Sequence, residues 1–142
     1  MKLIDFNKLQ EIIEEKGIIN YDEYIESIEQ AKADLNVQTE ELNKVVIDVL
    51  RAVRATGDED FFTSVQNEVN NIDAELDDAL EKLNLMQDQL NDMKEQSDSS
   101  DLQERLNSLT TLDKQFDNII TSLNDKFEGA PESVKAVNKF NE

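Results

Sequence analysis

The fold is decided by residues 62–93, which read FTSVQNEVNNIDAELDDALEKLNLMQDQLNDM. Apolar side chains recur alternately three and four residues apart along this stretch, at Phe62, Val65, Val69, Ile72, Leu76, Ala79, Leu83, Met86, Leu90 and Met93. We call these positions the second seam. This heptad spacing keeps one stripe of an α-helix facing a partner along its whole length. The stretch therefore predicts a helix roughly 48 Å long, at about 1.5 Å per residue, that must bury one edge.

A stretch further upstream has the same spacing. Its positions, which we call the first seam, are Tyr21, Tyr24, Ile28, Ala31, Leu35, Gln38, Leu42, Val45, Val49 and Ala52. Asn20, with Glu23 three residues later, is a typical N-terminal cap. Gly57 suits the left-handed backbone conformation that often follows the end of a helix. The sequence therefore predicts a first long helix over about residues 21–55.

Only residues 57–60 separate the two seams. So short a connection requires the two helices to run antiparallel as a helical hairpin. Folding the chain back at residues 57–58 places Val49 beside Val65, and Tyr21 near Met93 or Lys94. Pairing of the seams within one chain and pairing between chains both satisfy this pattern.

A polar stretch from Lys94 to Ser100 follows the second seam and marks a second turn. Ser100 and Gln103 have the spacing of a capping box that opens a third helix. The apolar positions of that helix are Leu102, Leu106, Leu109, Leu112, Phe116, Ile119, Ile120, Leu123 and Phe127. Gly129 and Pro131 then end it.

Short amphipathic segments flank these helices at both ends. Neither would be stable alone, so each is expected to dock on the bundle or on a partner. The predicted fold class is all-α: an elongated antiparallel three-helix bundle or coiled-coil hairpin with short flanking terminal helices. Its predicted parts are residues 1–19 (short helix and connector), 20–128 (three-helix coiled-coil-like bundle) and 129–142 (short C-terminal helix).

The composition favours a helical protein that binds other proteins. The 142 residues include three glycines, one proline and no tryptophan, which leaves too few turn signals for a sheet-rich fold. The 33 acidic and 14 basic residues give a net charge of −19, which opposes attraction to nucleic-acid phosphates and anionic lipids. We therefore expect protein partners, as a homo-oligomer or larger assembly, and no direct binding of nucleic acid or membrane.

Residue types suited to catalysis or metal binding are scarce. The chain has no His and no Cys, so the common general bases and nucleophiles are missing. Asp73, Glu75 and Asp77 alternate like the start of a Ca²⁺ loop, but the Gly that its sharp turn needs is absent. We expect no enzyme activity, no catalytic residue, no cofactor and no metal site. We expect no signal peptide or transmembrane segment, and a location in the cytoplasm or within an assembly.

Acidic residues concentrate in the middle of the chain. Residues 58–104 contain 15 acids against Lys82 and Lys94, a net charge of −13. The acids that we expect on the outer face are Asp77, Asp78, Glu81, Asp88 and Asp92. They either keep a bundle with apolar surface soluble or imitate a nucleic-acid backbone. We favour the first interpretation.

Two further features lie on the predicted first long helix. Lys44, Arg51 and Arg54 form a small basic island that can pair with acids of neighbouring helices or of another copy. Gln38 is a polar residue at a seam position, where it either fixes register or oligomer number or lies at a partly exposed edge.

The function that these patterns favour is that of a non-enzymatic structural or assembly protein, acting through helix–helix contacts in a larger complex such as a viral or phage particle. The candidate partner-binding residues are Phe61, Phe62, Tyr21, Met93, Leu3, Phe6, Leu9, Val134, Val137 and Phe140. The alternatives are an acidic nucleic-acid mimic that inhibits a DNA- or RNA-binding protein, and a coiled-coil chaperone that clamps with Phe61 and Phe62.

Overall fold

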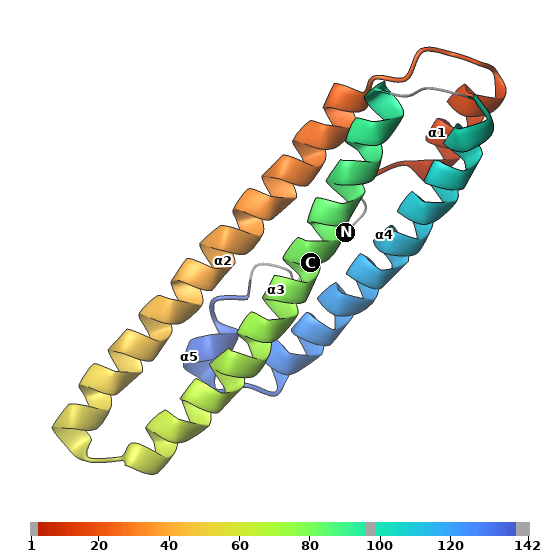
Figure 1. Cartoon of the computed structure of the whole chain (residues 1–142). Coiled ribbons are helices and arrows are strands. Elements are labelled where there is room, and N and C mark those ends of the chain that lie inside the picture. Colours follow the sequence, from red (N-terminus) through yellow and green to blue (C-terminus); the bar gives the residue numbers. More distant parts are fainter. Residues whose placement is uncertain (1–2, 96–98, 139–142) are drawn as a thin grey trace. The chain divides into compact units, whose positions relative to one another are not determined.

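A computed structural model describes residues 3–95 and 99–138, and the chain there forms five α-helices (Figure 1). The helices are α1 (Phe6–Glu14), α2 (Tyr21–Thr56), α3 (Glu59–Glu95), α4 (Ser99–Glu128) and α5 (Glu132–Lys135). The described residues contain no strand. Among the long helices, α2 packs on α3, and α3 packs on α4. The prediction of an all-α three-helix bundle is therefore confirmed.

The chain divides into two compact units, and each long helix contributes to both. Unit 1 is formed by Met1–Ala33 and Leu80–Asn118, and unit 2 by Asp34–Ala79 and Ile119–Glu142. Unit 1 therefore contains α1 with parts of α2, α3 and α4. Unit 2 contains the turn between α2 and α3, together with α5.

An ion pair between α2 and α3 shows how the two helices are aligned in unit 1. The Nζ atom of Lys94 lies 2.6 Å from Oδ1 of Asp22, and further along, Lys32 Nζ donates a 2.7 Å hydrogen bond to Gln87 Oε1. This alignment confirms the antiparallel pairing that the seam spacing predicts near Lys94. The apolar residues buried in unit 1 are Ile4, Leu9, Ile28, Ala31, Leu83, Met86, Leu90, Met93, Leu106, Leu109 and Phe116.

The core of unit 2 combines buried residues of the two seams with Val53 and with residues of α4 and of the segment that contains α5. Its buried apolar residues are Leu35, Leu42, Val45, Val49, Val53, Val65, Val69, Ile72, Leu76, Ala79, Ile120, Leu123, Phe127 and Val134. Full burial of each large aliphatic side chain contributes on the order of 1.5–3 kcal/mol. Near the turn the buried stripe shifts by one residue, because Ala52 is exposed whereas Val53 is buried.

Two residues connect α2 to α3. Gly57 has φ +77° and donates its backbone N–H to the Val53 carbonyl at 2.6 Å, which ends α2 as predicted. Asp58 caps α3, because its Oδ1 accepts the backbone N–H of Phe61 at 3.1 Å. At the other end of α2, the predicted cap is also present, with Asn20 Oδ1 accepting the N–H of Glu23 at 3.4 Å.

The start of α4 differs from the sequence prediction. The helix begins at Ser99, so Ser100 lies inside its first turn, whereas an N-cap must precede the first helical residue. The prediction of Ser100 as the cap is therefore wrong. The residue before Ser99 is outside the described part of the chain. The end of α4 at Glu128, just before Gly129, agrees with the prediction.

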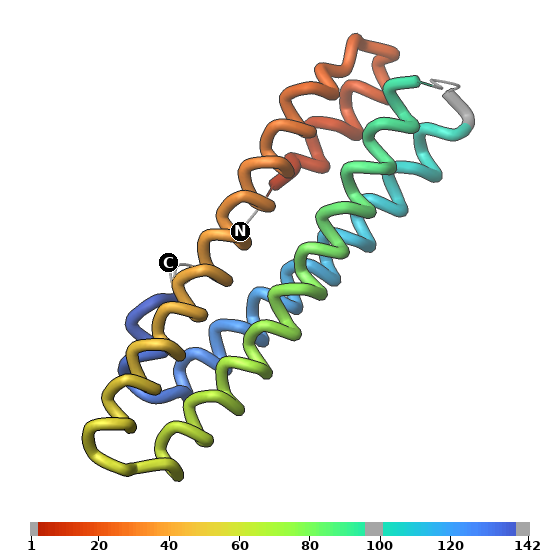
Figure 2. The backbone as a smooth tube through the Cα atoms, turned by 60° about the vertical axis from the view of Figure 1, so that its left-hand side comes forward, coloured from red at the N-terminus to blue at the C-terminus, as the bar shows by residue number. Residues whose placement is uncertain are grey.

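Both short helices dock on the bundle within their own units. In unit 1, α1 runs antiparallel to the first turns of α2 (Figure 2), buries Leu9, and joins α4 through a 3.0 Å hydrogen bond from Gln10 Nε2 to Gln103 Oε1. In unit 2, the segment with α5 buries Val134 and accepts a 2.6 Å hydrogen bond from Gln38 Nε2 at the Val137 carbonyl. Within residues 3–95 and 99–138, no helix is both long and apolar enough to cross a bilayer.

Candidate interaction surfaces

The predicted partner-binding residues lie at different depths. Met93, Leu9 and Val134 are buried inside the chain. Five others are half-buried, namely Tyr21, Phe62, Leu3, Phe6 and Val137. Phe61 is 44% exposed, and Phe140 lies outside the described residues. A partner can therefore reach Phe61 directly, whereas contact with the three buried residues requires a terminal helix or a seam to open.

Five large apolar side chains are exposed on the described surface. They are Ile18 (98% exposed), Val37 (42%), Ile47 (49%), Phe61 (44%) and Leu85 (40%). Ile18 lies in the connector between α1 and α2, and Phe61 lies in the first turn of α3. Val37, Ile47 and Leu85 lie within the two longest helices, on the sides that face away from the seams.

An exposed stripe on α2 repeats the three-four spacing of the buried seam. We call it the α2 outer stripe, and it consists of Val37, Glu40, Lys44, Ile47, Arg51 and Arg54. All six side chains are exposed. Lys44, Arg51 and Arg54 make no hydrogen bond or ion pair with any described residue. The stripe is therefore apolar and basic within a strongly acidic protein.

A corresponding stripe on α3 is apolar and acidic. We call it the α3 outer stripe, and it consists of Asp78, Glu81, Leu85, Asp88 and Asp92. Every member is exposed, as is the neighbouring Asp77, so all five acids predicted on the outer face lie there. Asp92 has an internal partner, because its Oδ2 lies 3.2 Å from Nη1 of Arg105. The other three stripe acids have none among the described residues.

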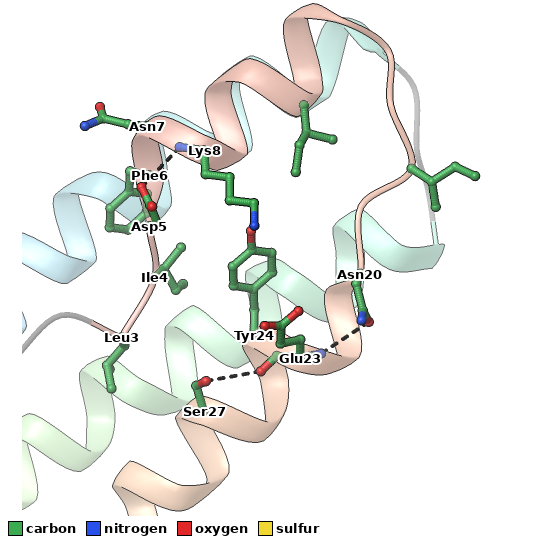
Figure 3. A pocket seen from close by; sticks show the side chains of 12 residues that line it. Leu3, Ile4, Asp5, Phe6, Asn7, Lys8, Asn20, Glu23, Tyr24 and Ser27 are labelled. Carbon is green, nitrogen blue, oxygen red and sulfur yellow. Dashed lines mark hydrogen bonds between the residues drawn. The ribbon is translucent and has the colours of Figure 1, made fainter.

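Unit 1 contains an open cleft of about 950 Å³ between the N-terminal segment with α1 and the first turns of α2 (Figure 3). Lys8 and Tyr24 point toward each other across it. Burial raises the pKa of the Tyr24 hydroxyl, and the charges of Glu23 and Asp5 raise it further, so Tyr24 stays protonated. The backbone carbonyl of Glu23 accepts a 3.2 Å hydrogen bond from Ser27 Oγ. The charged groups of its lining are one ammonium and two carboxylates, a net charge of −1.

Two acids that are two residues apart on α3 have opposite environments. The pKa of Glu75 is lowered, chiefly by the hydrogen bond from Lys126 Nζ to Glu75 Oε1 at 2.6 Å, with help from Ser122 Oγ at 3.1 Å. The pKa of Asp73 is raised by burial and by the charge of Asp77, and its Oδ1 is buried with no hydrogen-bond partner. Among the described residues, no group of acids is placed to hold a metal ion.

Comparisons with known proteins give no relative. No family model, curated protein or solved structure matches this chain. Any functional argument therefore rests on the surfaces of this chain itself.

Sequence reasoning missed the apolar members of both outer stripes. Val37, Ile47 and Leu85 are separated from seam residues by one or two positions, so they read as extensions of the seams rather than as a second face. The signal that could have found them is the spacing of the basic island, because Lys44, Arg51 and Ile47 already fall three and four residues apart. Gln38 was singled out, but its bond to the Val137 carbonyl was not foreseen.

Proposed function

We propose that this protein is a non-enzymatic structural component that works through helix–helix contacts in a larger assembly, with a viral or phage particle as one setting. The observation that carries the proposal is the pair of outer stripes. Each repeats the heptad spacing of a buried seam, and each keeps exposed apolar side chains, Val37 and Ile47 on α2 and Leu85 on α3. Positions with this spacing share one face of a helix, along which a neighbouring helix has room to lie.

The chemistry of the exposed stripes supports a binding role. Apolar residues flanked by charges are the pattern that helices use to choose a partner and its orientation, because the charges penalise wrong pairings. The chain also lacks His and Cys, the residue types from which catalytic sites are most often built. Both features favour a protein whose activity lies in its surface.

The test is size-exclusion chromatography of fresh extracts from cells that produce the protein at its natural level. We expect the wild type to elute in a complex larger than one chain. The double variant Ile47→Asp and Leu85→Asp should elute at the mass of the monomer, because a buried unpaired carboxylate disrupts a helix interface. The matched control is Ile18→Asp, which removes a more exposed apolar side chain outside both stripes and should leave the complex intact.

Two results would contradict this role. One is a wild-type protein that elutes at the monomer mass in the extract. The other is a complex that is equally sensitive to Ile18→Asp and to the stripe variant, because the stripes would then have no special part in it. Circular dichroism of each purified variant shows whether the helices are retained.

A second candidate function is supported by the exposure of all five predicted outer acids. In this role the protein would occupy the basic groove of a nucleic-acid-binding protein as an inhibitor. Replacement of Asp77, Asp78 and Glu81 by Lys would abolish such inhibition, whereas Ile47→Asp would leave it unchanged because Ile47 lies on the other stripe. Loss of binding in the Ile47→Asp variant would contradict the mimic and favour the assembly role.

A further inference from the structure

We infer that the α2 outer stripe of one copy binds the α3 outer stripe of a second copy, with the two helices antiparallel. The inference rests on the proposed assembly function and names its partner as a second copy of this chain. It starts from charge. Lys44, Arg51 and Arg54 have no internal acid in the described structure, although the chain carries 33 acids. Within the described residues, Asp78, Glu81 and Asp88 likewise have no internal cation.

One antiparallel register pairs Ile47 with Leu85 and brings three basic residues opposite three acids, while Val37 faces Glu95 beyond the α3 outer stripe. With Ile47 placed opposite Leu85, the heptad spacing brings Lys44 opposite Asp88 and Arg51 opposite Glu81. The next stripe position brings Arg54 opposite Asp78. An apolar pair is thus flanked by three opposite-charge pairs, the arrangement that favours one register over others.

The competing parallel orientation is less favourable. In a parallel alignment with Ile47 again opposite Leu85, the stripes would also give three attractive pairs, Lys44 with Glu81, Arg51 with Asp88 and Arg54 with Asp92, and one repelling pair, Glu40 with Asp78. Its repelling pair includes Asp78, which has no cation of its own among the described residues, and its Arg54 pair uses Asp92, which Arg105 already holds. The antiparallel register has one pair of like charges, Glu40 with Asp92. That repulsion is reduced because Asp92 already pairs with Arg105 in its own chain. The two orientations have equal numbers of attractive and repelling pairs, and the ion pair between Asp92 and Arg105 favours the antiparallel one.

The pairing is expected to be weak and sensitive to salt. Only one apolar side chain from each helix lies at its centre, and the three charged pairs lie at its exposed rim. Salt largely screens the interaction between exposed charges that lie further apart than the Debye length, which is about 10 Å at 0.1 M and about 3 Å at 1 M. The two stripes differ, and every copy carries both. Association is therefore heterologous, and it either closes into a ring or continues as a chain of copies.

The experiment is light scattering and sedimentation velocity of the purified full chain over a range of protein concentrations, at low salt and at about 1 M salt. The basic-stripe variant carries Lys44→Glu, Arg51→Glu and Arg54→Glu. The acidic-stripe variant carries Asp78→Lys, Glu81→Lys and Asp88→Lys. The matched control carries Lys8→Glu, Lys16→Glu and Lys114→Glu. It has the same net charge as the basic-stripe variant, and its three substitutions are also at exposed sites, outside the stripes.

We expect the wild type to self-associate at low salt and to dissociate at high salt. Each stripe variant alone should associate about tenfold more weakly or worse, whereas the control should behave as the wild type apart from its net charge. An equimolar mixture of the two stripe variants should associate again, because each then meets its complement. One chain carrying all six substitutions should also recover self-association, which shows that the substituted helices still fold.

Several results would overturn the inference. They are a wild type that stays monomeric at low salt, self-association that neither stripe variant weakens, and failure of both the mixture and the six-fold variant to recover it. Failure of the inferred self-association is distinguishable from failure of the proposed assembly function. If the purified chain is monomeric while its complex in extracts still depends on Ile47 and Leu85, the partner is another protein. If the purified chain associates through its stripes but is monomeric in extracts, the assembly function fails and the contact remains.

Discussion

Leu83 and Leu85 are the same residue type, two positions apart on α3, yet their surroundings are opposite. Leu83 is 0% exposed and packs in the core of unit 1, whereas Leu85 is 40% exposed on the α3 outer stripe. Two residues along an α-helix correspond to a turn of about 200°. The spacing of apolar residues therefore predicts which positions share a face, while the composition of that face indicates whether it lies inside or outside.

The two faces should respond differently to substitution, and the core face should show the largest effect. Leu83→Ala is expected to lower the free energy of unfolding by about 2–5 kcal/mol, because it removes buried methyl groups and leaves a cavity. Leu85→Ala should change it by less than about 0.5 kcal/mol. Chemical denaturation of both variants measures the difference. Equal losses at the two positions would mean that the outer stripe is covered in the folded protein.

Gln38 sharpens the comparison, because it is the polar exception on the buried side of α2. It is 0% exposed, and its Nε2 donates to the Val137 carbonyl at 2.6 Å. Gln38→Ala should cost about 1–3 kcal/mol through the lost hydrogen bond and the cavity that it leaves. Gln38→Met, which keeps most of the volume, isolates the hydrogen bond. Faster hydrogen exchange at the amides of residues 132–138 in both variants would show that Gln38 holds the C-terminal segment.

Substitution of Glu75 on α3 should have a smaller effect on stability, and that effect should depend on pH. The pKa of Glu75 is lowered in the folded protein, so its contribution to stability is present above its ordinary pKa and is lost as pH falls through the folded pKa. At neutral pH, Glu75→Gln should cost about 1 kcal/mol, since one partly buried charged hydrogen bond is weakened. Stability measured against pH should then show a shallower acid loss in the variant. If the variant lost stability at low pH as steeply as the wild type, the role assigned to Glu75 would be contradicted.

Substitution of Asp73 should change the stability in the opposite direction, and by the smallest amount. Its raised pKa means that its carboxylate destabilises the fold at neutral pH, and that this penalty disappears as pH falls through the folded pKa toward the ordinary value. Asp73→Asn should therefore raise stability at pH 7 by less than about 1 kcal/mol. Asp77→Asn is a useful second variant, because it removes the neighbouring charge and leaves Asp73 in place. A loss of stability in Asp73→Asn would show that the carboxylate has a favourable partner.

The helices and the buried stripes were predictable because their signals are periodic and local. A heptad pattern over 32 residues specifies a helix and its apolar face, and Asn20 and Gly57 mark where α2 begins and ends. The bond between Gln38 and Val137 was not predictable. The two residues are 99 positions apart, and α5 has only four residues, too few to show a period. The cap of α4 was misplaced because several serines lie together before Asp101.

The candidate surface was only partly predictable for a related reason. The outer acids could be placed because charges in a helical protein generally face water. Val37, Ile47 and Leu85 are apolar, so the sequence alone assigns them to the nearest apolar stripe. Their exposure follows from the packing of the long helices, which decides which of two similarly spaced stripes is covered.

The connection at Gly57 and Asp58 has a consequence for exchange of helices between molecules. A side chain added at Gly57 would meet no atom within 4 Å, so its left-handed φ of +77° is the only local barrier to substitution. Replacing both residues by alanine would favour continuation of α2 into α3 as one uninterrupted helix, whose two arms could no longer pack on each other. Each arm would then find its complementary seam in a second molecule, as in a domain-swapped dimer. The left-handed Gly57 and the cap Asp58 together thus keep the first and second seams within one chain.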